Sequence, residues 1–208
     1  MKPSTLFLSF CLGLSTTAAM AELKPGDAAP NFTVQAAQGG KEFKFSLAEA
    51  LKKGPVVLYF YPKSFTSICT FEAHEFAENI ENFEVAGATV IGISSDKIEV
   101  QREFSTKECR DKFPVGADPS LSVIKAYDAA FKIPLSGEAF ADRISYVISP
   151  EGKILYSYAD SNAEKHIKNT LAIVRKWQLL TPFLELSFSR LRLFDSPGAQ
   201  GLAPSRGI

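Results

Sequence analysis

The sequence predicts a single α/β domain with a central mixed sheet flanked by helices. Short, continuous apolar segments at residues 56–61, 89–93 and 144–148 have the length and composition of buried strands. Amphipathic helical patterns lie between them, so strands and helices alternate along the chain, as they do in α/β domains. The chain has 208 residues, of which 46% are hydrophobic and 22% charged, enough for one core of ordinary size.

The expected elements follow a simple order. They are a strand ending near residue 36, a helical turn at 46–52, a strand at 56–61, a helix from about 66, a strand at 89–93, helices at 97–112 and about 120–127, two strands after residue 143, and a final helix at about 163–178. Residues 149–153 should turn the last two strands into a hairpin, because Pro150 and Gly152 occupy positions that suit a tight turn. A βαβ half followed by a hairpin and a helix is the thioredoxin-like plan.

The helix after strand 56–61 has two distinct faces. Apolar residues recur three and four positions apart: Ala73, Phe76, Ala77, Ile80 and Phe83. Glutamates occupy the remaining arc: Glu72, Glu75, Glu78 and Glu81. This pattern predicts an amphipathic helix with its glutamates toward solvent. Thr66 or Ser67 could cap its start.

Cys69 falls in the first turn of this helix, where unpaired backbone amides carry partial positive charge and stabilise a thiolate. The alternative is that Cys69 continues the buried stripe as a small hydrophobic residue. Two neighbours favour a nucleophile. Thr66 has a hydroxyl that can reach the same pocket, and Pro62 can shield that pocket without offering a competing donor.

At Pro62, Thr66 and Cys69 the chain resembles the peroxiredoxins, whose active-site pattern is Pro-x-x-x-Thr-x-x-Cys. Arg143 stands where that family keeps an arginine beside the reactive sulfur, although without the motif it would read as a surface residue. Four more residues extend the match toward the Q subgroup, also called bacterioferritin comigratory protein: Lys63, Thr70, Glu72 and Ala73. Residues 26–32 resemble the family's opening, and the resemblance covers about residues 23–177.

The chain departs from the Q-subgroup pattern near the reactive cysteine. Ser67 and Ile68 replace the Pro-Gly that often precedes it, and His74 stands where many members have a second, resolving cysteine. Other members place that cysteine on the next helix, and Cys109, in the stretch 97–112, matches this arrangement. The alternative for Cys109 is a lone structural or surface thiol.

The resemblance implies a thiol-dependent peroxidase that acts on hydrogen peroxide and organic hydroperoxides without a cofactor or metal. The Cys69 thiolate would attack a peroxide oxygen and become a sulfenic acid, while Arg143 holds the developing charge and Thr66 hydrogen-bonds the peroxide. If Cys109 resolves, it condenses with the sulfenic acid into a disulfide that a thioredoxin-like protein reduces. Q-type members are often monomers, so a monomer is expected.

Three other classes of protein fit the sequence less well. A disulfide-exchange enzyme would show Cys-x-x-Cys, but Glu72 stands third after Cys69. A metal-binding module could use Cys69, His74 and Cys109, yet this set is sparse and lacks a recognisable spacing. His74 and His166 fit solvated helix residues better. A catalytically inert thioredoxin-like interaction domain would not need the proline, threonine, cysteine and arginine together.

Composition and the chain ends complete the predictions. Lys and Arg (23) balance Asp and Glu (23), and no basic cluster indicates a nucleic-acid partner. Residues 1–21 have the pattern of a secretory signal peptide, with an apolar run too short for a permanent membrane anchor. Its removal would leave Cys69 and Cys109 in an exported domain, 22–178, in a compartment that permits disulfides, such as a bacterial periplasm.

Residues 179–208 are expected to form a C-terminal extension beyond the domain. The alternation of Leu184, Leu186 and Phe188 with polar residues predicts an edge strand. Residues 196–208 are rich in Gly, Pro, Ala and Ser, which predicts disorder.

Overall fold

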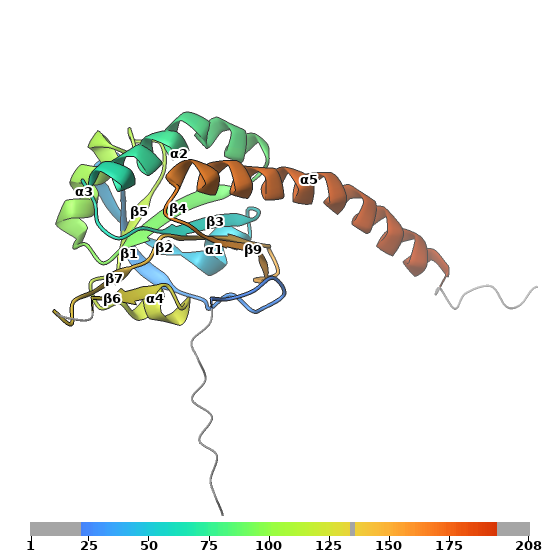
Figure 1. The fold of residues 1–208 in the computed structure, drawn as a ribbon. Coiled ribbons are helices and arrows are strands. Elements are labelled where there is room, and N and C mark those ends of the chain that lie inside the picture. Colours follow the sequence, from blue (N-terminus) through green and yellow to red (C-terminus); the bar gives the residue numbers. More distant parts are fainter. Residues whose placement is uncertain (1–21, 134–135, 195–208) are drawn as a thin grey trace, which may run out of the picture.

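The computed structural model describes residues 22–133 and 136–194, with side chains as far as residue 180. A seven-stranded sheet in the order β2-β1-β5-β4-β3-β8-β9 forms its centre (Figure 1). These strands are β1 (Thr33–Gln38), β2 (Lys41–Ser46), β3 (Val56–Phe60), β4 (Thr89–Ser94), β5 (Val115–Ala117), β8 (Ile144–Ile148) and β9 (Ile154–Ala159). The sheet is mixed, as expected, because β3, β4 and β5 run parallel and the other pairs run antiparallel.

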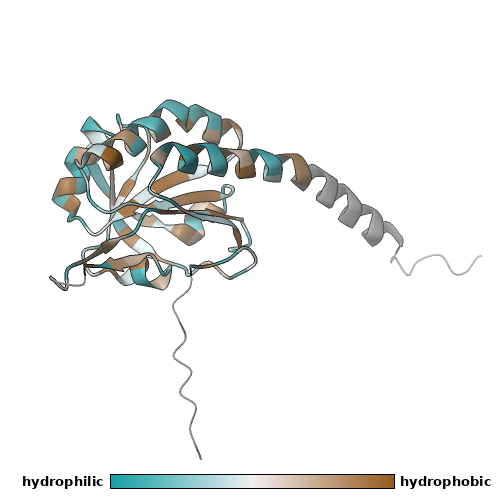
Figure 2. Ribbon diagram, in the orientation of Figure 1, coloured by the Kyte–Doolittle hydropathy of each residue, from teal (hydrophilic) through white to brown (hydrophobic). Residues whose placement is uncertain are grey.

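Helices cover both faces of this sheet. They are α1 (Leu47–Leu51), α2 (Ser67–Val85), α3 (Ile98–Lys107), α4 (Ser122–Ala126) and α5 (Ala163–Phe194). The long helices α2 and α5 pack side by side on one face, and α1 and α4 lie on the other (Figure 1). Figure 2 shows polar residues along the outer sides of α2 and α5. A small hairpin of β6 (Ala130–Lys132) and β7 (Ala139–Ala141) stands apart from the main sheet.

Strand β3 divides the core because its side chains alternate between the two faces. Val57 and Tyr59 belong to the apolar cluster under α2 and α5, while Leu58 and Phe60 belong to the cluster under α1 and α4. A strand buried on both faces reads as a continuous apolar run, which is why the sequence predicts it well. Strand β3 lies in the middle of the sheet, and the loop after its carboxyl end leads to the start of α2.

The predicted hairpin at residues 149–153 is confirmed. The Gly152 amide donates to the Ser149 carbonyl at 2.8 Å, and the Ser149 amide donates to the Lys153 carbonyl at 2.8 Å. Gly152 has a φ of +72°, a conformation that glycine adopts without a steric penalty. The sequence pattern does not predict strands β2, β5, β6 and β7. Strand β2 is mostly exposed and polar, and the other three have three residues each.

The predicted helix at 97–112 is too long, and Cys109 lies outside it. Helix α3 ends at Lys107, after which Arg110 and Asp111 both adopt positive φ angles that no helix can continue. The amides of Glu108 and Cys109 both donate to the Phe104 carbonyl, at 2.9 and 3.0 Å, and close the last turn. Cys109 therefore sits in the tight turn after α3.

The predicted edge strand at residues 184–188 is wrong, because helix α5 continues from Ala163 to Phe194 and projects beyond the sheet (Figure 1). A helix satisfies its backbone hydrogen bonds within the segment, whereas a strand needs a neighbour. No described helix is both long and apolar enough to span a bilayer. The signal peptide predicted at 1–21 and the disorder predicted at 196–208 lie outside the described residues.

Candidate active site

Cys69 is the third residue of α2 and is only 2% exposed. Strand β3 ends at Phe60, and the Tyr61 amide still donates to the Ile93 carbonyl of β4 at 3.1 Å. Half-buried Pro62 then starts a short loop that reaches α2. Because the first amides of a helix have no intrahelical acceptors, the helix start offers hydrogen-bond donors and partial positive charge around the thiol. The predicted placement of Cys69 is confirmed.

Thr66 occupies the N-cap position of α2, but its side chain does not cap the helix. Its hydroxyl donates to the Lys63 carbonyl at 2.9 Å instead, within the loop. The Thr66 carbonyl accepts from the Thr70 amide at 2.8 Å, the first backbone bond of the helix. The expectation of a hydroxyl cap is therefore wrong, because the Thr66 side chain is directed to the Lys63 carbonyl and its oxygen accepts no bond from the amides of the first turn.

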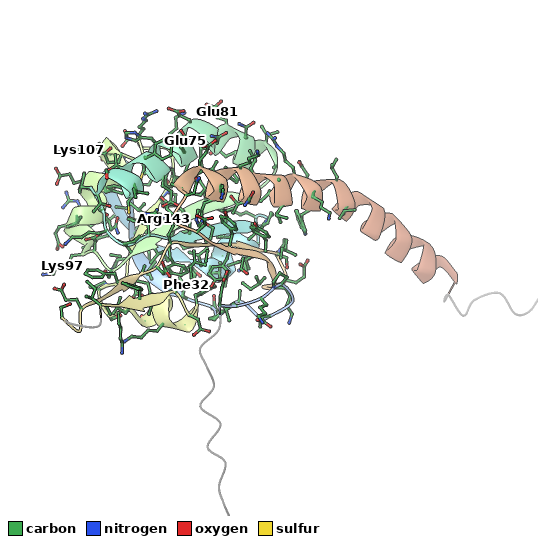
Figure 3. All side chains as sticks on the ribbon, viewed as in Figure 1. Phe32, Glu75, Glu81, Lys97, Lys107 and Arg143 are labelled. Atoms are coloured by element: carbon green, nitrogen blue, oxygen red, sulfur yellow. The ribbon has the colours of Figure 1, made fainter. Side chains whose placement is uncertain are left out.

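Arg143 contacts Cys69 from the segment that precedes β8, and not from the loop that carries Pro62 and Thr66. It precedes β8, which pairs with β3, so its guanidinium lies in the interior (Figure 3). Its Nη2 donates to the Cys69 Sγ at 3.2 Å, and its Nη1 donates to the Glu72 carboxyl. The predicted proximity of Arg143 and Cys69 is confirmed, although the two residues are 74 positions apart.

Glu72 is the residue that the sequence pattern misplaces. It is 0% exposed and paired with Arg143, whereas the pattern predicts a solvent position. Being three residues after Cys69, it shares the cysteine's face of α2. That spacing, together with a buried arginine that needs a hydrogen-bond acceptor, is the signal that could have placed it in the site.

The buried pair of Glu72 and Arg143 has linked ionisation. Burial raises the pKa of Glu72 to about 8, although Arg143 opposes this. For Arg143, burial disfavours the charge, but Glu72 and the Cys69 sulfur outweigh it and raise the pKa. We take burial as dominant for Glu72, because its Oε1 has no hydrogen-bond partner among the described residues and an ionised carboxylate would need one.

Cys109 is 0% exposed and belongs to the same apolar cluster as Cys69. Both cysteines are free thiols. Burial raises the pKa of the Cys109 thiol well above its usual value, and the nearby carboxylates of Glu108 and Asp111 add to this effect. Cys109 is therefore a protonated, unreactive thiol while the protein stays closed.

The two histidines have structural partners. Half-exposed His74 pairs with Glu108 at 2.7 Å. His166 does not lie on a solvated face as expected, because it is fully buried and lies 2.8 Å from the Ser145 hydroxyl and 2.9 Å from the Asp160 carbonyl. Within the described part of the chain, no group of three or more His, Cys, Asp or Glu residues is placed to hold a metal ion.

Comparisons with known proteins agree with this geometry. Residues 25–157 match the model of the AhpC/TSA family. The chain is 36% identical over 155 residues to peroxiredoxin Q of Oryza sativa subsp. japonica, covering 74% of this chain and 68% of the rice protein. It is 31% identical over 149 residues to peroxiredoxin Bcp of Escherichia coli, covering 71% and 92% of the two chains.

The solved structure of peroxidoxin BcpB from Mycobacterium tuberculosis is also similar. Its TM-score is 0.67 at 27% identity, over 74% of this chain and 97% of that one. The thioredoxin-like architecture predicted from the sequence is thereby confirmed. The family match and these relatives agree with a site in which an arginine contacts the sulfur of a cysteine at a helix start. The chain therefore belongs to the AhpC/TSA family as a Q-type peroxiredoxin, a thiol-dependent peroxidase.

Proposed function

We propose that Cys69 is the nucleophile of this peroxidase and that Arg143 is its electrostatic partner. The observation that carries this proposal is the 3.2 Å contact from the Arg143 guanidinium to the Cys69 sulfur. A cation that touches the sulfur favours the thiolate, which is the reactive form of cysteine. The same guanidinium can stabilise negative charge that develops on a peroxide oxygen.

The reaction is a two-electron displacement. The Cys69 thiolate attacks one oxygen of the peroxide, the S–O bond forms as the O–O bond breaks, and cysteine is oxidised to a sulfenic acid. The leaving oxygen departs as hydroxide or alkoxide and takes a proton to become water or an alcohol. Because the Thr66 hydroxyl proton is held by the Lys63 carbonyl, the role left to its oxygen is to accept a hydrogen bond from the peroxide. Pro62 has no amide proton and so adds no competing donor beside Cys69.

The test is peroxide consumption by the purified mature chain with a dithiol reductant. Wild-type protein should consume both hydrogen peroxide and an alkyl hydroperoxide, and Cys69→Ser should consume neither. The matched control is Cys109→Ser. It should still reduce one equivalent of peroxide, because it retains Cys69, but its later turnovers with the reductant should differ from those of the wild type. Wild-type consumption rates equal to those of Cys69→Ser would rule the proposal out.

For the second half of the cycle, we propose Cys109 as the resolving cysteine and a thioredoxin-like protein as the reductant. In support, Cys109 lies in the same apolar cluster as Cys69, and the two thiols are the only cysteines in residues 22–208. Its thiol would condense with the Cys69 sulfenic acid, forming a disulfide and releasing water. After peroxide and alkylation, mass analysis should show both thiols lost as one internal disulfide. A persistently free Cys109 beside oxidised Cys69 would instead establish a one-cysteine cycle.

We further propose that the enzyme is exported and acts as a monomer. The signal-peptide pattern of residues 1–21 supports export. The monomer is what the resemblance to the Q subgroup implies. When the full-length chain is expressed in a bacterium, the protein should appear in the periplasmic fraction. Its mass should be that of a chain that begins near Glu22. Light scattering of that material should give the mass of one chain. An uncleaved cytoplasmic product would contradict export, and a dimer mass would contradict the monomer.

A further inference from the structure

A chain of buried polar groups lies beneath the loop that carries Pro62 and Thr66. At its centre is Gln101 of α3, which is 0% exposed. Its Oε1 accepts from the Tyr61 hydroxyl at 2.7 Å. Its Nε2 donates to the Ser94 hydroxyl at 2.7 Å and to the Gly116 carbonyl at 3.1 Å. Because a carbonyl only accepts, this last contact establishes which end of the amide faces the sheet.

The loop is attached to this chain of polar groups at two points. The Ser64 hydroxyl lies 3.3 Å from the Tyr61 hydroxyl and 3.4 Å from the Gln101 Oε1. The Ser64 backbone amide donates to the Asp96 carboxylate at 2.7 Å, and Ser94 donates to the same carboxylate at 2.9 Å. Gln101 joins the loop side, through Tyr61 and Ser64, to Gly116 of β5. Asp96 makes a second link, from the Ser64 amide to Ser94 of β4.

The next loop residue is held in an unfavourable conformation. Phe65 has a φ of +64°, which is uncommon for a residue with a side chain. Its ring packs edge-on against Phe104 with centroids 5.2 Å apart, and the Tyr61 ring stacks on Phe104 at 5.6 Å. Phe104 lies one turn after Gln101 on α3. One face of α3 therefore holds the loop in place with a hydrogen-bonding and an aromatic contact.

We propose that Gln101 is a positioning residue for the peroxidase reaction. By holding Tyr61 and Ser64, it keeps the loop in the conformation that presents Cys69 to Arg143. The position requires a side chain that accepts at one end and donates at the other, which glutamine does and methionine or glutamate does not. This proposal rests on the proposed role of Cys69 as the nucleophile. A small displacement of the reacting sulfur would slow the reaction steeply.

The proposal is tested with two variants and a matched control. Gln101→Met keeps the length of the side chain and removes both hydrogen-bonding ends. Tyr61→Phe removes only the hydroxyl. The control is Tyr146→Phe, which deletes a buried tyrosine hydroxyl that donates to the Tyr127 carbonyl at 2.8 Å in the cluster on the other face of the sheet. All three lose a buried hydrogen bond, but only the first two release the loop.

The measured quantity is the second-order rate constant for oxidation of Cys69 by hydrogen peroxide, at a temperature where each variant is folded. Gln101→Met and Tyr61→Phe should each lower it at least about tenfold, and the double variant should be no slower than the slower single variant. Tyr146→Phe should stay within about twofold of wild type. Gln101→His, which can accept through one ring nitrogen and donate through the other, should recover most of the rate.

A second readout does not depend on activity. Hydrogen exchange of the Ser64 amide, which donates to Asp96 at 2.7 Å, should accelerate in Gln101→Met and keep the wild-type rate in Tyr146→Phe. Wild-type rates in Gln101→Met and Tyr61→Phe would overturn the proposal, as would an equal loss of rate in Tyr146→Phe. If wild-type protein itself fails to react with peroxide while exchange in the loop still responds to Gln101→Met, the proposed function falls and the anchoring of the loop stands.

Discussion

At the scale of single residues, the site depends on one guanidinium shared between a thiol and a carboxyl. Arg143 donates to Cys69 through one nitrogen and to Glu72 through the other. These two contacts together fix the orientation of the planar group, so Glu72 helps to hold Arg143 against the sulfur. Because Arg143 is buried, its charge acts on the Cys69 sulfur through a medium of lower dielectric than water.

Replacing Arg143 should slow the first step of the reaction. Arg143→Gln keeps a donor near the sulfur but removes the positive charge, so the rate constant for Cys69 oxidation should fall about 10²- to 10³-fold. Arg102→Gln, which removes an exposed arginine paired with Glu42 at 3.4 Å, should leave the rate unchanged. Rapid mixing with peroxide followed by alkylation measures both. Equal rates for the two variants would remove Arg143 from the mechanism.

Glu72 should make the stability of the fold depend on pH. Its pKa rises from 4.5 to about 8 on folding, so the native state binds the proton more tightly than the unfolded chain does. The free energy of unfolding should therefore decrease as pH rises through this interval. A tenfold change in proton affinity corresponds to about 1.4 kcal/mol, so the loss should amount to a few kcal/mol. In Glu72→Gln, which cannot ionise, urea denaturation at several pH values should show this slope removed. Parallel pH curves would contradict the assignment.

At the scale of elements, the start of α5 is attached to the sheet by His166. The ring lies 2.8 Å from the Ser145 hydroxyl of β8 and 2.9 Å from the Asp160 carbonyl that follows β9. Burial lowers the pKa of His166, and the positive charge of Arg143 lowers it further, against the hydrogen bond to Asp160. The neutral ring satisfies both contacts, accepting from Ser145 and donating to Asp160.

Protonation of His166 should loosen α5 in acid. The unfolded chain takes up this proton more readily than the native state, so the free energy of unfolding should decrease as pH falls below about 6.5. His166→Gln offers an acceptor and a donor without an ionisable ring and should lose this decrease. Thermal denaturation from neutral to mildly acidic pH, compared between the two proteins, is the measurement. An unchanged acid limb in the variant would show that another group is responsible.

The elements also show how far the sequence alone can go. Strands β3, β4 and β8 are continuous apolar runs and α2 is strongly periodic, so the part of the fold that holds Cys69 is predictable. Short strands such as β5 carry too few residues for a period to appear. The end of α3 depends on the positive φ angles of Arg110 and Asp111, which no local sequence pattern predicts. The sequence misplaces Glu72 and His166 because their partners, Arg143 and Ser145, are distant along the chain.

At the scale of the whole molecule, the reduced structure buries both cysteines. Cys109 is fully buried in the turn after α3, its thiol is held protonated, and no disulfide joins it to Cys69. On the proposed resolving role of Cys109, we expect disulfide formation to move the turn around Cys109 out of the apolar cluster, at a cost in buried surface.

Oxidation should therefore change protection from hydrogen exchange. After one equivalent of peroxide, amides at residues 105–112 should exchange faster than in the reduced protein, and a dithiol should restore their protection. Cys109→Ser, which can form the sulfenic acid but no internal disulfide, should keep the slow exchange. Fast exchange in that variant, or a disulfide with unchanged protection, would contradict the need for opening.

The most direct test of the central claim, that Cys69 is the sulfur that reduces peroxide, is to trap its oxidised form. Cys109→Ser protein is mixed with one equivalent of hydrogen peroxide and then with dimedone, which reacts with sulfenic acids, and peptide mass analysis locates the adduct. The structure predicts one adduct on Cys69, formed at least about tenfold faster than when Arg143 is also replaced by glutamine. Unmodified Cys69 after peroxide has been consumed, or an adduct at another residue, would contradict it.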